Sequence, residues 1–173
     1  MKISQKLIAC SSVLLGMAVA SVSVHANSVS SNDADCLGGP TSRVFTVTAN
    51  SVIKCLAKGT GNINGNSDMF QLANPGYLYL DSSDPTAGPG LMNGSLTGNP
   101  VLTQGLGGTF NISPSVYLTY KDVAIGFKVG EGQLDPDWAV FQLAPNTLTG
   151  TWAVSGNQAL SHAMLYGKLC ALA

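Results

Sequence analysis

Short segments of alternating apolar and polar residues recur about every ten residues from Arg43 onwards, with turn-forming glycine, proline and asparagine between them. Alternation with a period of two places one set of side chains on each face of a β-strand. No segment carries apolar residues at the three- and four-residue spacing of a convincing amphipathic helix. We therefore expect an all-β fold, an antiparallel β-sandwich of the jelly-roll or immunoglobulin-like kind, formed as a single domain by residues 43–173.

The expected strands lie at residues 44–48, 52–57, 77–80, 108–112, 116–120, 123–129, 139–143, 150–154 and 160–166. Residues 81–100 contain four glycines and three prolines, and we expect this stretch to be largely loop. Because long loops often carry binding sites, it is also a candidate to shape a binding surface.

Residues 1–26 have the form of a secretory signal peptide. Lys2 and Lys6 make a short basic head, an apolar run follows at residues 7–20, and small residues lead up to Ala26, where a signal peptidase would cut. The run is too short to span a bilayer. The leader therefore predicts export from the cytoplasm.

Export sets the expected limits of the mature chain. We expect it to begin at Asn27, with a flexible leader over residues 27–42 and no membrane-spanning segment. A lipoprotein box ending at Cys10 is a competing interpretation, but that box begins the apolar run, whereas a lipoprotein box normally follows it. The expected location is secreted, outside the cell or at its surface, with the periplasm as the alternative.

The composition excludes several classes of partner. Charged residues make up 10% of the chain, well below the roughly 25% of ordinary soluble domains. The predicted signal peptide (residues 1–26) holds two of the eight basic residues and none of the nine acidic ones, so the mature chain is mildly acidic. With no basic stripe, binding to nucleic acid or anionic lipid is not expected.

Three of the four cysteines follow the predicted signal peptide: Cys36, Cys55 and Cys170. Export favours a disulfide, and three cysteines leave one over. We expect a Cys36–Cys55 bond, which closes a short loop, and a Cys170 that is unpaired or bonded to another molecule. A Cys55–Cys170 bond is the alternative, because terminal strands of a sandwich often lie side by side.

The loop at residues 62–68 has the most interesting local pattern. Asn62, Asn64, Asn66 and Asp68 place oxygen-bearing side chains at alternate positions around a glycine, as in loops that wrap a calcium ion. A single carboxylate would bind the cation weakly, and the same residues are common in turns with left-handed backbone. We expect a turn and no cofactor, with calcium as the alternative.

Two pairs of carboxylates could serve a glycoside hydrolase, Asp81 with Asp84 and Asp135 with Asp137. Such an enzyme needs two carboxyl groups about 5–9.5 Å apart in a cleft. Asp-Ser and Asp-Pro pairs are also common turn formers. We expect these four residues to be loop residues.

Three other residue types were weighed as functional groups. Ser161 and His162 combine a hydroxyl and an imidazole, but neighbours on a strand point to opposite faces, so we expect no nucleophile–base pair. Trp138 and Trp152 could stack on sugars, yet both lie in apolar alternating segments and are expected in the core. No Gly-x-Ser-x-Gly motif is present in the sequence.

The C-terminal part of the chain resembles a known group. Gly150-Thr151-Trp152 followed by Leu160-Ser161-His162-Ala163-Met164-Leu165-Tyr166-Gly167 is similar to the ending of secreted bacterial proteins of the PEP-CTERM group. Upstream, further short motifs occur in the same order as in those proteins. They are Gly108-Thr109-Phe110, Tyr117 and Tyr120, Phe127-Lys128-Val129-Gly130 and Ala139-Val140-Phe141. The resemblance covers residues 50–167 and implies a small β-sandwich exported by a Gram-negative bacterium, in a group not known for enzymes.

The chain departs from that group after Gly167. Members continue into Pro-Glu-Pro, a transmembrane helix and a basic tail, whereas this sequence stops at Ala173. The resemblance therefore implies the ectodomain alone, without the signal for exosortase processing.

Together these patterns predict a secreted, non-catalytic structural protein of the cell surface or extracellular matrix. Its expected partners are other matrix components or copies of itself, which an unpaired edge strand could join. The alternative is a carbohydrate- or calcium-binding module that uses the loop at residues 62–68 or an exposed Trp138. A carboxylate-dependent hydrolase ranks third.

Overall fold

The computed structural model describes residues 43–83, 90–93, 99–102, 105–130, 134–156 and 158–170. The predicted signal peptide (1–26) and leader (27–42) lie outside the described residues, as does Asp84.

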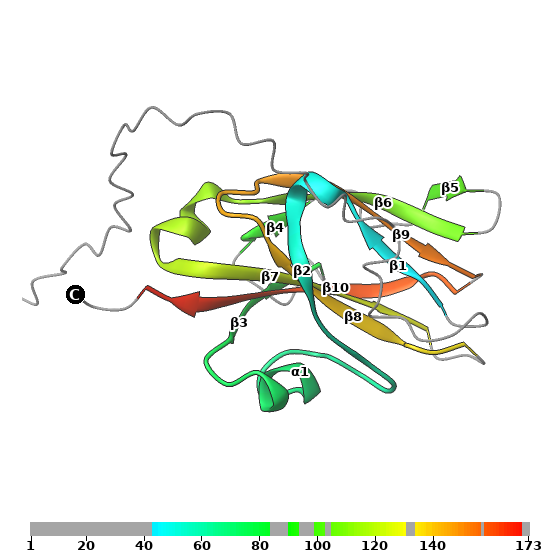
Figure 1. Ribbon diagram of the computed structural model, residues 1–173, viewed down its shortest axis with the longest axis horizontal. Coiled ribbons are helices and arrows are strands. Elements are labelled where there is room, and N and C mark those ends of the chain that lie inside the picture. Colours follow the sequence, from blue (N-terminus) through cyan, green and yellow to red (C-terminus); the bar gives the residue numbers. More distant parts are fainter. Residues whose placement is uncertain are drawn as a thin grey trace, which may run out of the picture.

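Two antiparallel β-sheets make up most of the described chain (Figure 1). Sheet A has the strand order β1-β9-β6-β4, with β5 also paired to β6, and sheet B has the order β2-β8-β7-β10-β3. Sheet A contains β1 (Phe45–Val47), β4 (Met92–Asn93), β5 (Asn99–Leu102), β6 (Gly105–Ile112) and β9 (Thr149–Ser155). Sheet B contains β2 (Val52–Gly59), β3 (Leu78–Ser82), β7 (Tyr120–Val129), β8 (Trp138–Leu143) and β10 (Leu160–Leu169). The all-β, antiparallel sandwich predicted from the alternation is confirmed.

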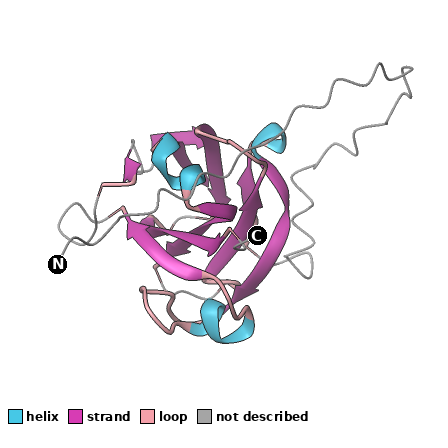
Figure 2. Ribbon diagram, turned by 90° about the vertical axis from the view of Figure 1, so that its left-hand side faces the viewer, coloured by secondary structure: helices cyan, strands magenta, loops and turns pink. Residues whose placement is uncertain are grey.

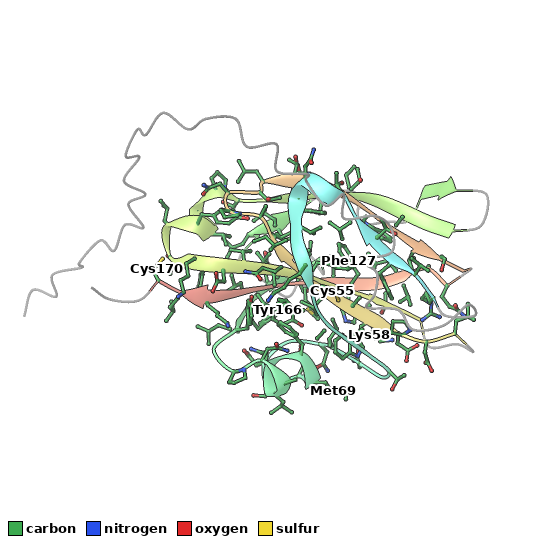
Figure 3. The ribbon with its side chains drawn as sticks, in the orientation of Figure 1. Cys55, Lys58, Met69, Phe127, Tyr166 and Cys170 are labelled. Atoms are coloured by element: carbon green, nitrogen blue, oxygen red, sulfur yellow. The ribbon has the colours of Figure 1, made fainter. Side chains whose placement is uncertain are left out.

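The main core lies between the two sheets. Alternate residues of β1, β6 and β9 face alternate residues of β7, β8 and β10, and nearly all of these inner side chains are buried. At the centre, Phe127 of β7 and Trp152 of β9 stack with ring centroids 5.4 Å apart. Phe127 is labelled in Figure 3 between the two layers. The period-two pattern thus buries one face of each sheet against the other.

A third layer covers the outer face of sheet B. The chain leaves β2 at Gly59, forms the loop at residues 60–68 and the short helix α1 (Met69–Ala73), and returns to β3. Figure 1 shows α1 on the side of sheet B that faces away from sheet A, and in Figure 2 the helix at the bottom of the view lies outside the strands. Ile63, Phe70 and Tyr77 of this layer pack on Tyr166 of β10 as a second buried cluster.

Gly126 of β7 makes this close packing possible. A Cβ atom at this position would lie 3.0 Å from Ile63 Cδ1 and 3.1 Å from Val140 Cγ2. Such separations are shorter than ordinary carbon–carbon contacts of about 3.5–4.0 Å. The missing side chain therefore lets the third layer lie directly on the sheet.

Two expectations about local structure are wrong. Residues 116–120 were expected as a strand, but Pro114–Leu118 form the 3₁₀ helix η3, and Tyr120 begins β7. Ser113 caps η3 with a side-chain bond to the backbone N–H of Ser115, and proline is favoured at a helix start. The sequence prediction also missed α1, β4, β5 and the short 3₁₀ helix η2 (Ala49–Ser51).

Both described cysteines, Cys55 and Cys170, are disulfide-bonded. The expectation that Cys170 is unpaired or intermolecular is therefore wrong. The two are not bonded to each other, because Cys55 on β2 lies three strands away from β10, about 14 Å at roughly 4.8 Å per strand. A disulfide requires Cα atoms within about 7 Å, and Figure 3 shows the two residues well apart. Cys36 lies outside the described residues, so the Cys36–Cys55 bond stays a prediction.

Candidate functional site

Asp68, the residue expected to bind calcium, joins the third layer to sheet B. Its Oδ2 accepts a hydrogen bond of 2.7 Å from the Tyr166 hydroxyl and one of 3.4 Å from the Gly65 backbone N–H. Its Oδ1 accepts a bond of 3.0 Å from the Gln71 backbone N–H and so caps the start of α1. The Asp68 side chain is buried, and both of its oxygens serve the fold.

The other three candidate ligands do not gather around Asp68. Asn62, Asn64 and Asn66 are exposed, and the backbone turns sharply between them at Gly65 (φ 123°) and Ser67 (φ 62°). Left-handed backbone of this kind is the turn geometry that the glycine and asparagine content favours. Across the described part of the chain, no three His, Cys, Asp or Glu residues are grouped so that they could hold a metal ion.

The contact with Asp68 and burial both act on the Tyr166 hydroxyl. Burial raises the pKa of Tyr166 far above its usual value, and the hydrogen bond and negative charge of Asp68 raise it further. A buried phenol next to a carboxylate keeps its proton, because ionisation would place two negative charges side by side. Tyr166 is therefore a permanent hydrogen-bond donor to Asp68.

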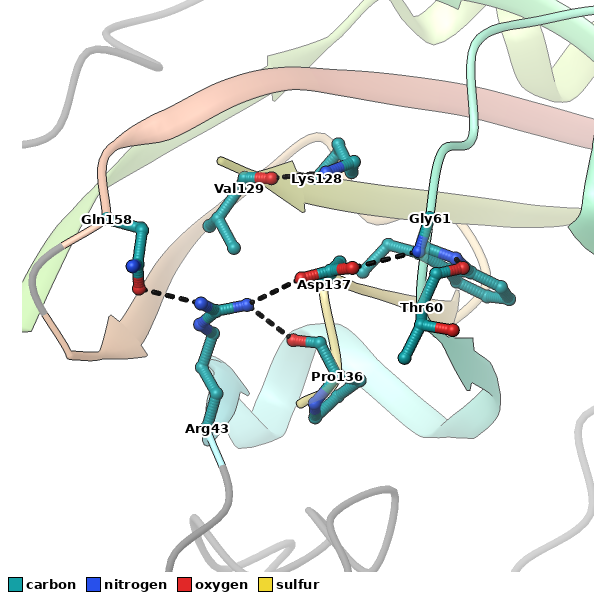
Figure 4. A network of polar contacts seen from close by, with 9 residues as sticks. Arg43, Thr60, Gly61, Lys128, Val129, Pro136, Asp137 and Gln158 are labelled. Atoms are coloured by element: carbon teal, nitrogen blue, oxygen red, sulfur yellow. Dashed lines mark hydrogen bonds and ion pairs between the residues drawn. The ribbon is translucent and has the colours of Figure 1, made fainter. Parts of the chain in front are cut away.

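A second polar network lies around Arg43, near the end of β7 and the start of β8 (Figure 4). Arg43 is fully buried, and its Nη1 lies 3.3 Å from Asp137 Oδ1 and donates a 2.8 Å bond to the Pro136 carbonyl. Its Nη2 donates a 2.7 Å bond to Gln158 Oε1. Asp137 Oδ2 accepts a 2.8 Å bond from the Gly61 backbone N–H. The network ties the segment before β1 to the starts of β8 and of the third layer.

The carboxylates proposed for a hydrolase do not form a catalytic pair. Asp81 is buried, and its two oxygens accept bonds from the backbone N–H groups of Ser82 and Met92. Asp81 is on β3 and Asp137 precedes β8, three strands away, which is about 14 Å and exceeds the 5–9.5 Å that glycoside hydrolysis needs. Asp135 is exposed, and Asp84 lies outside the described residues.

Contrary to expectation, the side chains of Ser161 and His162 contact each other. Ser161 Oγ lies 3.1 Å from His162 Nδ1 because the pairing of β10 with β7 shifts between Leu160 and His162, which breaks the strict alternation. His162 Nε2 lies 2.6 Å from the Ile63 carbonyl oxygen, so this nitrogen carries the proton and donates. Nδ1 then accepts from the serine hydroxyl, and the pair holds the third layer on β10.

Both tryptophans are core residues, as expected. Trp138 is 3% exposed and Trp152 is 2% exposed. The Trp138 indole N–H donates a 3.1 Å bond to the Thr60 carbonyl, whereas the Trp152 indole N–H is buried and has no partner in the structure. The proposal of an exposed Trp138 that stacks on a sugar is therefore wrong.

None of the helices in the described segments is long and apolar enough to cross a membrane. No protein-family model, no curated protein and no solved structure matches this chain. The function has to be argued from the contacts given above.

Neither buried polar network was predicted, although the sequence contains a signal for one of them. Asp68-Met69-Phe70-Gln71 has the Asp-x-x-Gln spacing of a helix start, in which the first side chain caps the backbone three residues later. That spacing predicts the role of Asp68 as a cap. Nothing local predicts the pair of Arg43 and Asp137, because 94 residues separate them.

Raising the pH above 10 is expected to destabilise the protein. Burial raises the pKa of Tyr117 to about 12, and burial together with nearby Asp122 raises that of Tyr77 to about 12. In the unfolded chain tyrosine loses its proton near pH 10. Between the two values the unfolded state binds fewer protons, so stability falls as the pH rises. Urea unfolding at pH 9, 10 and 11 measures this loss.

The variant Tyr117→Phe isolates one of these groups. Its stability should be lower at pH 9, because the 2.7 Å bond to the Thr147 carbonyl is lost, but should depend less on pH between 10 and 12. A pH dependence identical to that of the unmodified chain would contradict the assignment.

Proposed function

We propose that the protein is exported and serves as a non-catalytic structural component of the cell surface or extracellular matrix. The observation that carries the proposal is the use made of its buried carboxylates. Asp68, Asp81 and Asp137 each direct both oxygens at hydrogen-bond donors of the fold. A catalytic carboxylate must instead present an oxygen to a substrate. These polar groups stabilise the sandwich, as a structural protein requires.

Two features of the sequence support the same proposal. The leader at residues 1–26 favours export. The low content of charged residues and the resemblance to PEP-CTERM proteins favour a place in extracellular material. The resemblance is part of the proposal.

Cell fractionation tests the export. The full chain with a C-terminal tag should yield a product that begins at Asn27 and is found outside the cytoplasm. The matched control is Leu14→Arg, which places a charge in the apolar run and should keep the chain unprocessed. An unmodified chain that stays in the cytoplasm with its leader intact would overturn the proposal.

Self-association is a sharper form of the proposal. The free edge of β2 is poorly suited to adding a strand, because its pairing with β8 shifts twice and the strand carries Lys54 and Lys58. Bulges and lysines are features that protect edge strands. Among the described strands, we therefore expect any strand addition at the other edges, which are formed by β1, by β4 and β5, and by β3. Light scattering over a range of concentrations measures it, and a monomer at every concentration would count against this form.

The alternative in which the loop at residues 62–68 binds calcium or Trp138 stacks on a sugar receives less support from the geometry. Because both oxygens of Asp68 are engaged and Trp138 is buried, we expect calcium chloride to leave the melting temperature unchanged. A calcium-dependent rise in the melting temperature that Asp68→Asn abolishes would revive the calcium site. Magnesium chloride at equal ionic strength is the matched control.

A further inference from the structure

The outer face of sheet A carries short polar side chains and no charge. The strands β1, β4, β5, β6 and β9 contain no Asp, Glu, Lys, Arg or His residue. The inner positions of β1, β4, β6 and β9 supply residues to the main core, so their alternate positions point outward. The threonine face, as we name it, consists of the half-exposed Thr46 and the exposed Thr48, Thr109, Asn111, Thr149 and Thr151.

Strand pairing arranges these side chains in rows. Thr151 of β9 pairs with Thr109 of β6, and on its other side Thr151 bonds to Thr48, with the two hydroxyl oxygens 2.6 Å apart. Thr149 pairs with Asn111, which in turn pairs with Asn93 of β4. Neighbours within a row are about 4.8 Å apart and successive rows about 6.8 Å apart. Figure 1 shows that β6, β9 and β1 lie side by side across this sheet.

The polar groups of the face are available to a partner. Within the described residues, the side chains of Thr109, Thr149 and Asn111 make no hydrogen bond, although all three are exposed. The charged side chains of the strands lie instead on sheet B, where Lys54, Lys58 and Lys168 are found. The absence of charge is therefore a property of one sheet and not of the whole surface.

The side-chain types on the threonine face indicate which classes of partner it could bind. Protein interfaces depend on aromatic and arginine anchors, nucleic acids and acidic polymers on lysine and arginine, and membranes on exposed apolar side chains. None of these types occurs among the six outward residues of the threonine face. A hydroxyl group both donates and accepts, which matches the hydroxyl groups of a neutral sugar.

We propose that the threonine face binds an extended, uncharged polysaccharide. Threonine is stiff about χ1, so little side-chain freedom is lost on binding. A flat array of rows suits a polymer that lies along it, and many weak contacts then add up through multivalency. The inference takes only the extracellular location from the proposed function, since an exported protein would meet such polymers outside the cell.

Sedimentation with an insoluble polymer tests the proposal. The purified chain is mixed with microcrystalline cellulose, with chitin and, as an acidic comparator, with calcium alginate. We expect retention on cellulose or chitin that added salt does not weaken, because no charges are involved, and no retention on alginate. In Thr109→Val with Thr149→Val, two free hydroxyl groups are lost and the shape is kept, so the binding constant should fall at least fivefold.

The control variant is Thr119→Val, which removes an exposed hydroxyl outside sheet A and should bind like the unmodified chain. Thermal melting checks that both variants fold, and valine suits an exposed strand position.

Three results of the sedimentation assay would each overturn the proposal: no retention on either neutral polymer, equal retention of the double variant, or loss of retention in added salt. So would a dimer in light scattering that the double variant abolishes, because the face would then join two copies. The assay uses purified protein, so failed export would leave its result unaffected.

Discussion

Replacing Asp137 with alanine is expected to lower the free energy of unfolding by about 3–5 kcal/mol. The change leaves the Arg43 guanidinium, which is 0% exposed, without its only ion-pair partner in the described structure. It also removes the acceptor of the Gly61 backbone N–H. A buried cation without an anion is among the most destabilising single changes in a protein. Urea unfolding at neutral pH measures the effect.

Two further variants separate the ion pair from other causes. Asp135→Ala alters an exposed carboxylate two residues away and should change stability by less than about 0.5 kcal/mol. Arg43→Met combined with Asp137→Leu removes both charges and should recover much of the loss, because neither group is then left unpaired. A loss below about 1 kcal/mol for Asp137→Ala would show that the network contributes little.

The second large effect is expected at Trp152. Trp152→Ala should cost about 3–5 kcal/mol, because it opens a cavity in the core between the sheets. The indole is 2% exposed and stacks on Phe127 with an interplanar angle of 26°. Buried residues from the inner faces of both sheets belong to the same core cluster as the ring. Thermal and urea unfolding report the change.

Phenylalanine substitutions at the two tryptophans provide a matched comparison. Trp152→Phe should cost less than Trp138→Phe, because the Trp152 indole N–H has no hydrogen-bond partner. Trp138→Phe abolishes the bond to the Thr60 carbonyl, a loss of about 1 kcal/mol beyond the change in volume. The reverse order would contradict the assignment of the Trp152 N–H as a group without a hydrogen-bond partner.

Much of the strand pattern could be predicted from the sequence. Eight of the nine expected strands coincide with an observed strand, from β1 through β3 and from β6 through β10. Alternation is a local signal, since burial on one face of a sheet imposes a period of two. The segment at residues 116–120 failed because Ser113 and Pro114 favour a helix start and outweigh the apolar alternation that follows them.

The candidate site could be predicted only in part. The loop at residues 62–68 was correctly expected to turn, but the role of Asp68 depends on Tyr166, which is 98 residues away in the chain. Ser161 and His162 were expected to diverge, and a shift in strand register brings their side chains together. A register shift depends on the partner strand, so it has no signature in the strand itself.

The alternation of apolar and polar residues was enough to predict the class of fold and the approximate positions of most strands, because a period of two needs no knowledge of distant partners. The composition also showed the scarcity of charge. The roles of the buried polar groups became clear only from the folded structure. Arg43 meets Asp137, and Asp68 meets Tyr166, because segments far apart in the chain become neighbours in the fold. Burial then makes each of these groups dependent on its partner, since an unpaired polar group in the interior is costly.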